Sequence, residues 1–282
     1  MELDAWRRKS ISLLRDTGYD DAESTVRLIL DDGLGLSPAF VLTHPEAPFD
    51  ETEANRILKR ILGGEPAAYV LGTVNFAGLS LKVTPDVLIP RPETEELADW
   101  IIHDRKGRSF RMLDLCTGSG CILTAVLSAC PDAEGMGTDL SDHALKVARE
   151  NLNRHQCDTR AALTAGSMFE AVDPEEQFDV IVSNPPYVTA HEMEELPEVV
   201  RKEPRMALYG GRDGLNAYRV IAKEGGRYLL PGGRLYLEIG CSQADQVSGL
   251  LTDAGWCGIE VRKDLSGRDR MISAGRKGEW DV

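Results

Sequence analysis

The sequence has no long apolar run, and this absence excludes a broad class of protein. No stretch of its 282 residues approaches the length that a membrane-spanning helix requires. The first ten residues, MELDAWRRKS, lack the apolar central region of a secretory signal. Hydrophobic residues make up 42% of the chain, which is an ordinary share for a soluble globular protein and allows a sizeable core. We therefore expect a cytoplasmic protein without a membrane partner.

Cysteine is sparse and shows no metal-binding pattern. The six cysteines, at positions 116, 121, 130, 157, 241 and 257, are scattered, and no two have Cys-x-x-Cys spacing. Paired spacing of that kind is typical of zinc sites and redox couples. We expect reduced thiols that pack as small apolar side chains, and we expect no metal site.

The chain has little positive charge for its size. It contains 32 Lys and Arg against 46 Asp and Glu, which gives a net charge of −14. A protein that holds nucleic acid through its phosphates needs clustered Lys and Arg. The composition therefore argues against stable nucleic-acid binding, although an acidic protein can still carry a local basic face.

Residues 1 to about 62 have the apolar spacing of helices. Three segments carry apolar residues three and four positions apart, and each ends at or beside a glycine. In the third segment, Asp50 is a typical N-cap, Glu53 can complete a capping box, and Gly63 ends the helix. Because this region shows no catalytic constellation, we expect a small helical domain over residues 1–72 that serves in recognition or support.

Residues 73–92 link this region to a segment of different character. In the run VNFAGLSLKVTPDVLIP, apolar and polar residues alternate and some residues are β-branched, which is typical of a β-hairpin. From about residue 110, strand-like runs alternate with helical segments, and this predicts a mainly parallel sheet with helices on both faces. The last two runs, CGIEVRKD and DRMISAG, are joined by the polar LSGR, which predicts an antiparallel edge hairpin. The predicted class for residues 93–282 is therefore α/β and Rossmann-like.

A glycine-rich turn follows the first strand of this region. In LDLCTGSGCI, Gly118 and Gly120 lie between a predicted strand and a helix, where a ligand can approach the backbone and free amides. Asp139 follows Gly118 by 21 residues, at the expected end of the next strand, where a carboxylate can accept from both hydroxyls of a ribose. Taken separately, the glycines could form a plain tight turn and Asp139 could cap a helix. Together they predict a nucleoside cofactor.

This turn lacks the third glycine of dinucleotide sites. Those sites have Gly-x-Gly-x-x-Gly, whereas Cys121, Ile122 and Leu123 follow Gly120 here. A cofactor without phosphates fits better. S-adenosylmethionine combines an adenosine with a charged methionine tail, and Asp114, just before the turn, suits that cation. We therefore expect S-adenosylmethionine as cofactor and S-adenosylhomocysteine as product.

A later strand ends in an asparagine followed by two prolines. The run IVSNPPY places Asn184 at a carboxyl end of the sheet, where ligands bind, and the prolines have no N–H groups to extend the strand. The side-chain oxygen of Asn184 and the carbonyl of Pro185 can accept both hydrogens of a planar NH2 group, aim its nitrogen and favour the developing positive charge. Pro186 keeps the turn rigid, and Tyr187 offers an aromatic wall. Asn184, Pro185 and Tyr187 are thus candidate catalytic residues, within a substrate pocket formed by residues 184–187.

These motifs resemble a known family. Asn-Pro-Pro-Tyr after a strand, with DLCTGSG upstream, is similar to the amino-methylating S-adenosylmethionine-dependent methyltransferases. The chain more closely resembles the PrmC/HemK protein-glutamine methyltransferases through, in order, EPAAYVLG, NFAG, VLIPRPETEEL, DLCTGSGCI, IVSNPPYV, EPRMALYGGRDGLNAYR, PGGRLYLEIG and DLSGRDRM. The resemblance covers nearly the whole chain, and IPRPETE best separates it from nucleic-acid enzymes.

The resemblance implies a fold and an activity. It implies a class I S-adenosylmethionine-dependent methyltransferase domain, preceded by a small helical-bundle domain and a hairpin linker. The expected reaction is methylation of the side-chain nitrogen, N5, of the glutamine in the Gly-Gly-Gln motif of class I peptide chain release factors, which tunes translation termination. The expected state is a monomer.

The resemblance also implies site residues. The expected cofactor contacts are Thr117, Gly118, Ser119, Gly120, Cys121, Asp139, Met168 and Asn184. Asn184 would contact both cofactor and substrate. On the adenine side, where the family often has an acidic residue followed by a large aromatic one, this chain has Ser167 and Met168, and Met168 can still pack on a ring. Arg91, Glu93 and Thr94 are expected to shape a cofactor lid.

The residues by themselves leave the acceptor open between glutamine and adenine. Adenine presents a similar planar NH2, so an exocyclic-amine methyltransferase for DNA or RNA is an alternative. The acidic charge and the short stretch after Tyr187, fewer than a hundred residues, disfavour it. A non-enzymatic nucleoside-binding scaffold is a third possibility, but docking alone would need neither Asp139 nor Asn184. The choice of glutamine depends on the resemblance.

Overall fold

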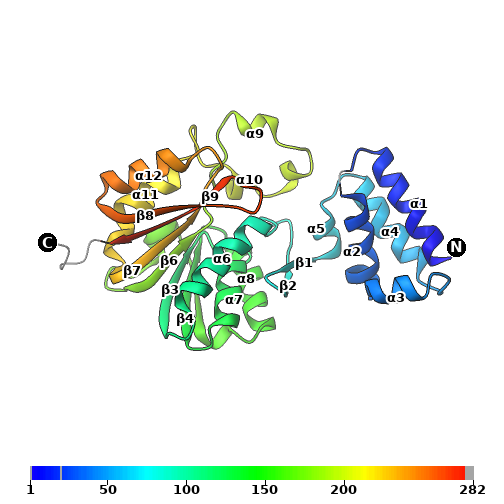
Figure 1. The fold of residues 1–282 in the computed structure, drawn as a ribbon, viewed down its shortest axis with the longest axis horizontal. Coiled ribbons are helices and arrows are strands. Elements are labelled where there is room, and N and C mark those ends of the chain that lie inside the picture. The colour runs from blue at the N-terminus through cyan, green and yellow to red at the C-terminus, as the bar shows by residue number, and fades with distance from the viewer. Residues whose placement is uncertain (1, 20, 277–282) are drawn as a thin grey trace. The chain divides into compact units, whose positions relative to one another are not determined.

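The chain forms two compact units (Figure 1). The computed structural model describes residues 2–19 and 21–276. One unit comprises the chain up to residue 74 together with 197–202, and the other comprises 75–196 and the chain from 203 onward. Each unit has a buried apolar core of its own. Within the described ranges, no helix is both long and apolar enough to cross a membrane.

The first unit is mainly helical. Its helices are α1 (Leu3–Asp16), α2 (Ala22–Leu34), α3 (Pro38–Thr43), α4 (Glu51–Leu62) and α5 (Ala67–Leu71). The three helices predicted from apolar spacing are confirmed as α1, α2 and α4. The other two are six and five residues long, too short for spacing to reveal them.

The start of α4 shows one prediction confirmed and one wrong. Asp50 caps the helix, since its carboxylate accepts the Glu53 backbone N–H at 3.0 Å. Glu53 does not complete a capping box: both of its carboxylate oxygens accept from the Arg56 guanidinium, at 2.6 and 2.7 Å. The charged, bidentate partner one turn away outcompetes a single backbone N–H.

The predicted hairpin is confirmed as β1 (Thr73–Phe76) and β2 (Leu79–Lys82). Its two turn residues, Ala77 and Gly78, have φ angles of 50° and 76°. Positive φ at both positions is the type I′ geometry that matches strand twist.

The second unit contains a seven-stranded sheet in the order β5-β4-β3-β6-β7-β9-β8. Its strands are β3 (Phe110–Leu115), β4 (Ala133–Asp139), β5 (Ala161–Ala165), β6 (Phe178–Ser183), β7 (Leu229–Glu238), β8 (Trp256–Lys263) and β9 (Asp269–Arg276). The strands from β5 to β7 are parallel, and β9 is antiparallel to both of its neighbours. The predicted Rossmann-like α/β class with an antiparallel edge hairpin is confirmed.

Helices cover both faces of this sheet (Figure 1). On one side lie α6 (Pro92–Arg105), α7 (Cys121–Ala129) and α8 (Asp142–Arg154); on the other lie α11 (Asn216–Glu224) and α12 (Ala244–Asp253). The short α9 (Glu192–Glu195) and α10 (Arg205–Leu208) belong to the long connection between β6 and β7. This covering explains why β3 and β6 are buried along most of their length.

The strand order reverses at β3. The chain passes from β3 to β4 and β5 on one side, and then returns to place β6 on the other side of β3. Leu115, the last residue of β3, is paired with Thr138 of β4 and Ser183 of β6. The carboxyl ends of these three strands therefore meet at a topological switch point, which is where open α/β sheets bind ligands.

Candidate active site

A cavity of about 230 Å³ opens at this switch point. Most of the predicted site residues line it: Thr117, Gly118, Ser119, Cys121, Asp139, Met168, Asn184 and Pro186. Three others, Gly120, Pro185 and Tyr187, are not among the described residues that form its wall. The fold thus brings together residues that end or follow four different strands, β3, β4, β5 and β6.

The two glycines of the turn have different surroundings. Both have positive φ, +56° at Gly118 and +73° at Gly120. A Cβ added at Gly118 would meet only the Cys116 carbonyl oxygen, at 3.9 Å, whereas one at Gly120 would lie 3.0 Å from the Ala148 Cβ. Gly118 therefore keeps space open beside the cavity, and Gly120 lets α8 approach the turn.

The Asp139 carboxylate is fixed by two backbone amides. One oxygen accepts from the Gly118 N–H at 2.9 Å and the other from the Ser141 N–H at 2.8 Å. Burial raises its pKa, and these two hydrogen bonds oppose that shift. Since each carboxylate oxygen can accept more than one hydrogen bond, Asp139 can still receive two hydroxyl groups from a ligand.

Asp114 has an unused acceptor in a buried position. The side chain is 1% exposed, and one oxygen accepts from the Thr117 hydroxyl at 2.6 Å. The other oxygen has no hydrogen-bond partner within the described part of the chain. Burial raises the pKa of Asp114 to about 7. A buried acceptor without a donor is costly, and a cationic ligand group would relieve that cost.

Two sulfur-containing residues adopt unusual backbone conformations beside the cavity. Cys116 has a φ of 58° and Met168 a φ of 51°, both in the left-handed region that glycine prefers. Their sulfur atoms lie 3.7 Å apart. Burial raises the pKa of the Cys116 thiol to about 12, so it remains a neutral thiol. Together they form a polarisable, apolar wall suited to an aromatic ring.

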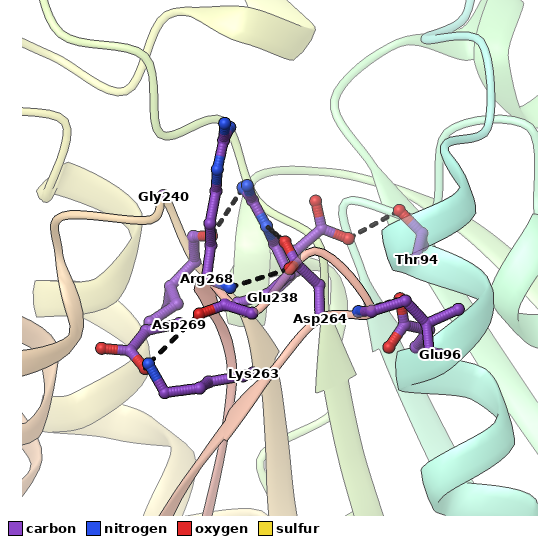
Figure 2. Close-up of polar contacts among 12 residues, drawn as sticks. Thr94, Glu96, Glu238, Gly240, Lys263, Asp264, Arg268 and Asp269 are labelled. Atoms are coloured by element: carbon purple, nitrogen blue, oxygen red, sulfur yellow. Dashed lines mark hydrogen bonds and ion pairs between the residues drawn. The ribbon is translucent and has the colours of Figure 1, made fainter.

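Asn184 is connected to a buried carboxylate through a threonine. Its Nδ2 atom donates to Thr94 Oγ1 at 3.0 Å, and Thr94 Oγ1 donates to Glu238 Oε2 at 2.6 Å. Figure 2 shows Thr94 on α6 pointing toward the Glu238 carboxylate. Glu238 is 1% exposed, and burial raises its pKa to about 7. Thr94, expected only to shape a lid, thus contacts Asn184 directly.

Tyr187 faces the same carboxylate. Its hydroxyl donates to Glu238 Oε1 at 3.3 Å, and its half-buried ring packs against the core of the sheet. Gly210 packs closely against the Asn-Pro-Pro-Tyr turn, since an added Cβ would lie 2.5 Å from the Pro186 carbonyl oxygen. The later glycine motif therefore supports the turn. Within the described residues, no protein donor bonds to the Pro185 carbonyl.

A third buried carboxylate holds one rim of the cavity. Glu203 is 4% exposed and accepts from the Ile89 backbone N–H at 3.0 Å and from the Arg91 guanidinium at 2.5 Å. These bonds join the cavity-lining segments 86–90 and 204–207. Sequence analysis missed Glu203 and Glu238. A signal was available for both, because Glu203 opens EPRMALYGGRDGLNAYR and Glu238 lies in PGGRLYLEIG, two of the motifs that carry the family resemblance.

Two family models match the chain. The methyltransferase small domain matches residues 98–212, and the PrmC N-terminal domain matches residues 5–72. The first match contains the cavity residues from Cys116 to Asn184. The second lies in the helical unit.

Similar proteins extend over nearly the whole chain. A protein of Bordetella pertussis named release factor glutamine methyltransferase is 42% identical over 263 residues, which cover 92% of this chain and 96% of that protein. Proteins with the same name from Caulobacter vibrioides and Cereibacter sphaeroides are each 40% identical, covering 92% and 95% of this chain and 91% and 96% of their own lengths.

Solved structures share the fold. A methyltransferase from Pyrococcus furiosus superposes with a TM-score of 0.55 at 20% identity, over 80% of this chain and 99% of that one. The hMettl16 catalytic domain superposes with a TM-score of 0.56 at 14% identity, over 73% of this chain and 78% of that one. At these identities the likeness concerns the fold alone.

Proposed function

The chain belongs to the release factor glutamine methyltransferase family, and from this premise we propose its reaction. It transfers a methyl group from S-adenosylmethionine to the side-chain nitrogen, N5, of the glutamine in the Gly-Gly-Gln motif of class I peptide chain release factors. The other product is S-adenosylhomocysteine. The observation that carries this proposal is the Asn184 amide, which lines the same cavity as Asp139.

The chemistry of the cavity suits this cofactor. The Asp139 carboxylate would accept from the ribose hydroxyls. Asp114 is hydrogen-bonded to the cavity-lining Thr117 but is not itself among the lining residues, and its unpaired oxygen would accept from the ammonium group of the methionine tail. Met168 and Cys116 would pack on the adenine ring. Gly118 leaves room for the ligand, while Thr117, Ser119, Gly120 and Cys121 complete the turn that faces it.

The Asn-Pro-Pro-Tyr turn would hold the substrate amide. When bound, the cofactor supplies an electrophilic methyl group on a positively charged sulfur. Asn184 Oδ1 and the Pro185 carbonyl would accept the two N–H groups of the glutamine side chain, which aims its nitrogen at that methyl group. Because the nitrogen gains positive charge on attack, these two acceptors stabilise the transition state more than the ground state. A proton then leaves the methylated nitrogen to water.

The other residues of the turn support this geometry. Pro186 lines the cavity and cannot donate a competing hydrogen bond. Tyr187 anchors the end of the turn to Glu238. Arg91, through Glu203, holds the rim over the cofactor. Glu93 would act through its negative charge, which helps to raise the pKa of Glu238.

The helical unit would recognise the body of the release factor. It has its own core and includes the match to the PrmC N-terminal domain. We assign residues 1–72 to recognition, 73–92 to a linker and 93–282 to methyl transfer. The enzyme would act as a monomer in the cytoplasm, where its substrate works, and would not bind nucleic acid stably.

Radiolabelled methyl transfer tests the proposal. Labelled S-adenosylmethionine is offered with the enzyme to a purified class I release factor, to its Gly-Gly-Ala variant, and to bulk DNA and RNA. Label on the unmodified release factor alone is the expected result. Label on nucleic acid instead would overturn the substrate and assign the same turn to an exocyclic amine.

A further inference from the structure

The polar chain behind Asn184 has a fixed direction. Thr94 Oγ1 lies 2.6 Å from Glu238 Oε2 and 3.0 Å from Asn184 Nδ2. An ionised carboxylate can only accept, so the single proton of the hydroxyl is donated to Glu238. The hydroxyl oxygen then offers Asn184 only lone pairs. The Asn184 amide must therefore turn its NH2 group toward Thr94.

We propose that Thr94 and Glu238 are positioning residues that keep the Oδ1 atom of Asn184 available as an acceptor for the substrate NH2 group. Steric fit cannot enforce this orientation, because the two ends of an amide are nearly the same size. In the flipped amide, two N–H donors would face the two N–H groups of the substrate. The inference rests on the proposed function, since it assumes an acceptor group with two hydrogens.

Glu238 is held from several elements at once. Tyr187 donates to its second carboxylate oxygen, and Tyr218 of α11 donates to its backbone carbonyl at 2.9 Å. The positive charge of Arg270 on β9 favours the ionised form, whereas Glu93 on α6 and burial favour the protonated form. The carboxylate therefore has a positive neighbour that opposes the cost of its burial.

Arg270 is itself fixed at the edge hairpin. Its guanidinium donates to the Ile239 carbonyl at 3.1 Å and to Asp264 at 3.4 Å, and its side chain is 12% exposed. Figure 2 shows Asp264 in the loop between β8 and β9, with Glu238 and Thr94 beyond it. Strand β9 therefore supplies the cation that faces the polar chain, and Asp264 of this loop helps to hold it.

A pair of threonine variants separates orientation from packing. Thr94→Val keeps the shape and removes the hydroxyl, whereas Thr94→Ser keeps the hydroxyl. We expect Thr94→Val to lower kcat by about 10- to 100-fold while the KM for release factor and the affinity for S-adenosylhomocysteine change by less than about threefold. Thr94→Ser should recover most of kcat.

Thr124→Val is the matched control. Thr124 is also a buried threonine, but its hydroxyl has no partner among the residues described. The same chemical change there should leave kcat unaltered. If Thr94→Val turned over as fast as Thr94→Ser, the positioning role would be refuted and the proposed function would stand.

The pH profile of Glu238→Gln gives a second readout that a purely structural role would not move. The folded-state pKa of Glu238 is raised, so its acceptor-only form is present above about pH 7 and lost below it. In the wild type, kcat should fall as pH decreases through this region. The amide oxygen introduced by Glu238→Gln can still accept from Thr94, but the amide does not titrate. The fall of kcat at low pH should therefore be absent in Glu238→Gln. Identical profiles in the two proteins would overturn the proposal, even if Thr94→Val failed to fold.

The wild type serves as the reference for the function itself. If it labelled nucleic acid and not release factor, the proposed function would fail. The same variants would then be assayed on the amine that is labelled, because the orientation argument requires only an NH2 acceptor. Loss of kcat in Thr94→Val on that amine would support positioning, and no loss would refute it.

Discussion

Alanine substitutions at Gly118 and Gly120, the two glycines of the turn, should have different effects on stability and ligand binding. Both have positive φ, so alanine at either position costs about 1–2 kcal/mol of backbone strain. At Gly120 the new Cβ would also lie 3.0 Å from the Ala148 Cβ and 3.2 Å from its Cα. Overpacking of this kind adds about 1–3 kcal/mol. The free energy of unfolding should thus fall by about 1–2 kcal/mol in Gly118→Ala and by about 2–5 kcal/mol in Gly120→Ala.

Thermal unfolding and ligand titration separate the two effects. For a domain of about 200 residues, 1 kcal/mol corresponds to about 2–4 °C in Tm. Gly118→Ala should therefore lower Tm by about 2–8 °C, and Gly120→Ala by about 4–20 °C. The Gly118 methyl group would occupy space beside the cavity, so the affinity for S-adenosylhomocysteine should fall about 5- to 150-fold. Under conditions in which Gly120→Ala is folded, its affinity for S-adenosylhomocysteine should stay within about threefold of that of the wild type.

Two results would contradict these different roles of Gly118 and Gly120. Equal losses of Tm in the two variants would show that α8 does not limit the space at Gly120. Undiminished binding of S-adenosylhomocysteine by Gly118→Ala would remove that glycine from the ligand site. Differential scanning calorimetry without ligand and isothermal titration of S-adenosylhomocysteine provide both measurements.

Three further substitutions test the remaining site. Asn184→Ala should abolish methyl transfer in the radiolabel assay while S-adenosylhomocysteine still binds; turnover like that of the wild type would refute the proposed pocket. Asp139→Ala should weaken S-adenosylhomocysteine binding by about 1.5–3 kcal/mol, or about 10- to 150-fold, and an unchanged titration would exclude a ribose contact. Burial raises the pKa of Asp114 to about 7, and the ammonium group of S-adenosylhomocysteine should bind the ionised carboxylate. The affinity of the wild type for S-adenosylhomocysteine should therefore increase from pH 6 to pH 8. Asp114→Asn should bind S-adenosylhomocysteine more weakly and show a smaller increase in affinity with pH. The same pH dependence in the wild type and in Asp114→Asn would show that the ammonium group of the ligand does not bind at Asp114.

Local patterns were enough to predict much of the fold. Alternating strands and helices predicted the parallel sheet, and the short polar link between the last two runs predicted the antiparallel edge. Such features depend on near neighbours in the chain, such as periodic apolar residues and turn-forming glycines. For the same reason, the short helices α3 and α5 and the competing partner of Glu53 were not foreseen.

Without the family resemblance, the candidate site could be predicted mainly where its residues lie at the ends of strands. Asp139 ends one parallel strand and Asn184 follows another, and the rule that such ends meet at one edge of a sheet predicts that they lie together. The different surroundings of Gly118 and Gly120 were not predictable, because α8 approaches only one of them.

By itself, the sequence determined the α/β class, and it predicted a nucleoside-type signature at Gly118 and Asp139 and an amide-binding turn at Asn184. Only the tertiary structure decided what orients that turn. Thr94 and Glu238 are separated by 144 positions in the chain, yet their side chains share a hydrogen bond. A buried polar group needs a hydrogen-bond partner, and the packing of helices and strands decides which residue provides it. The local spacing of residues in the sequence does not indicate that packing.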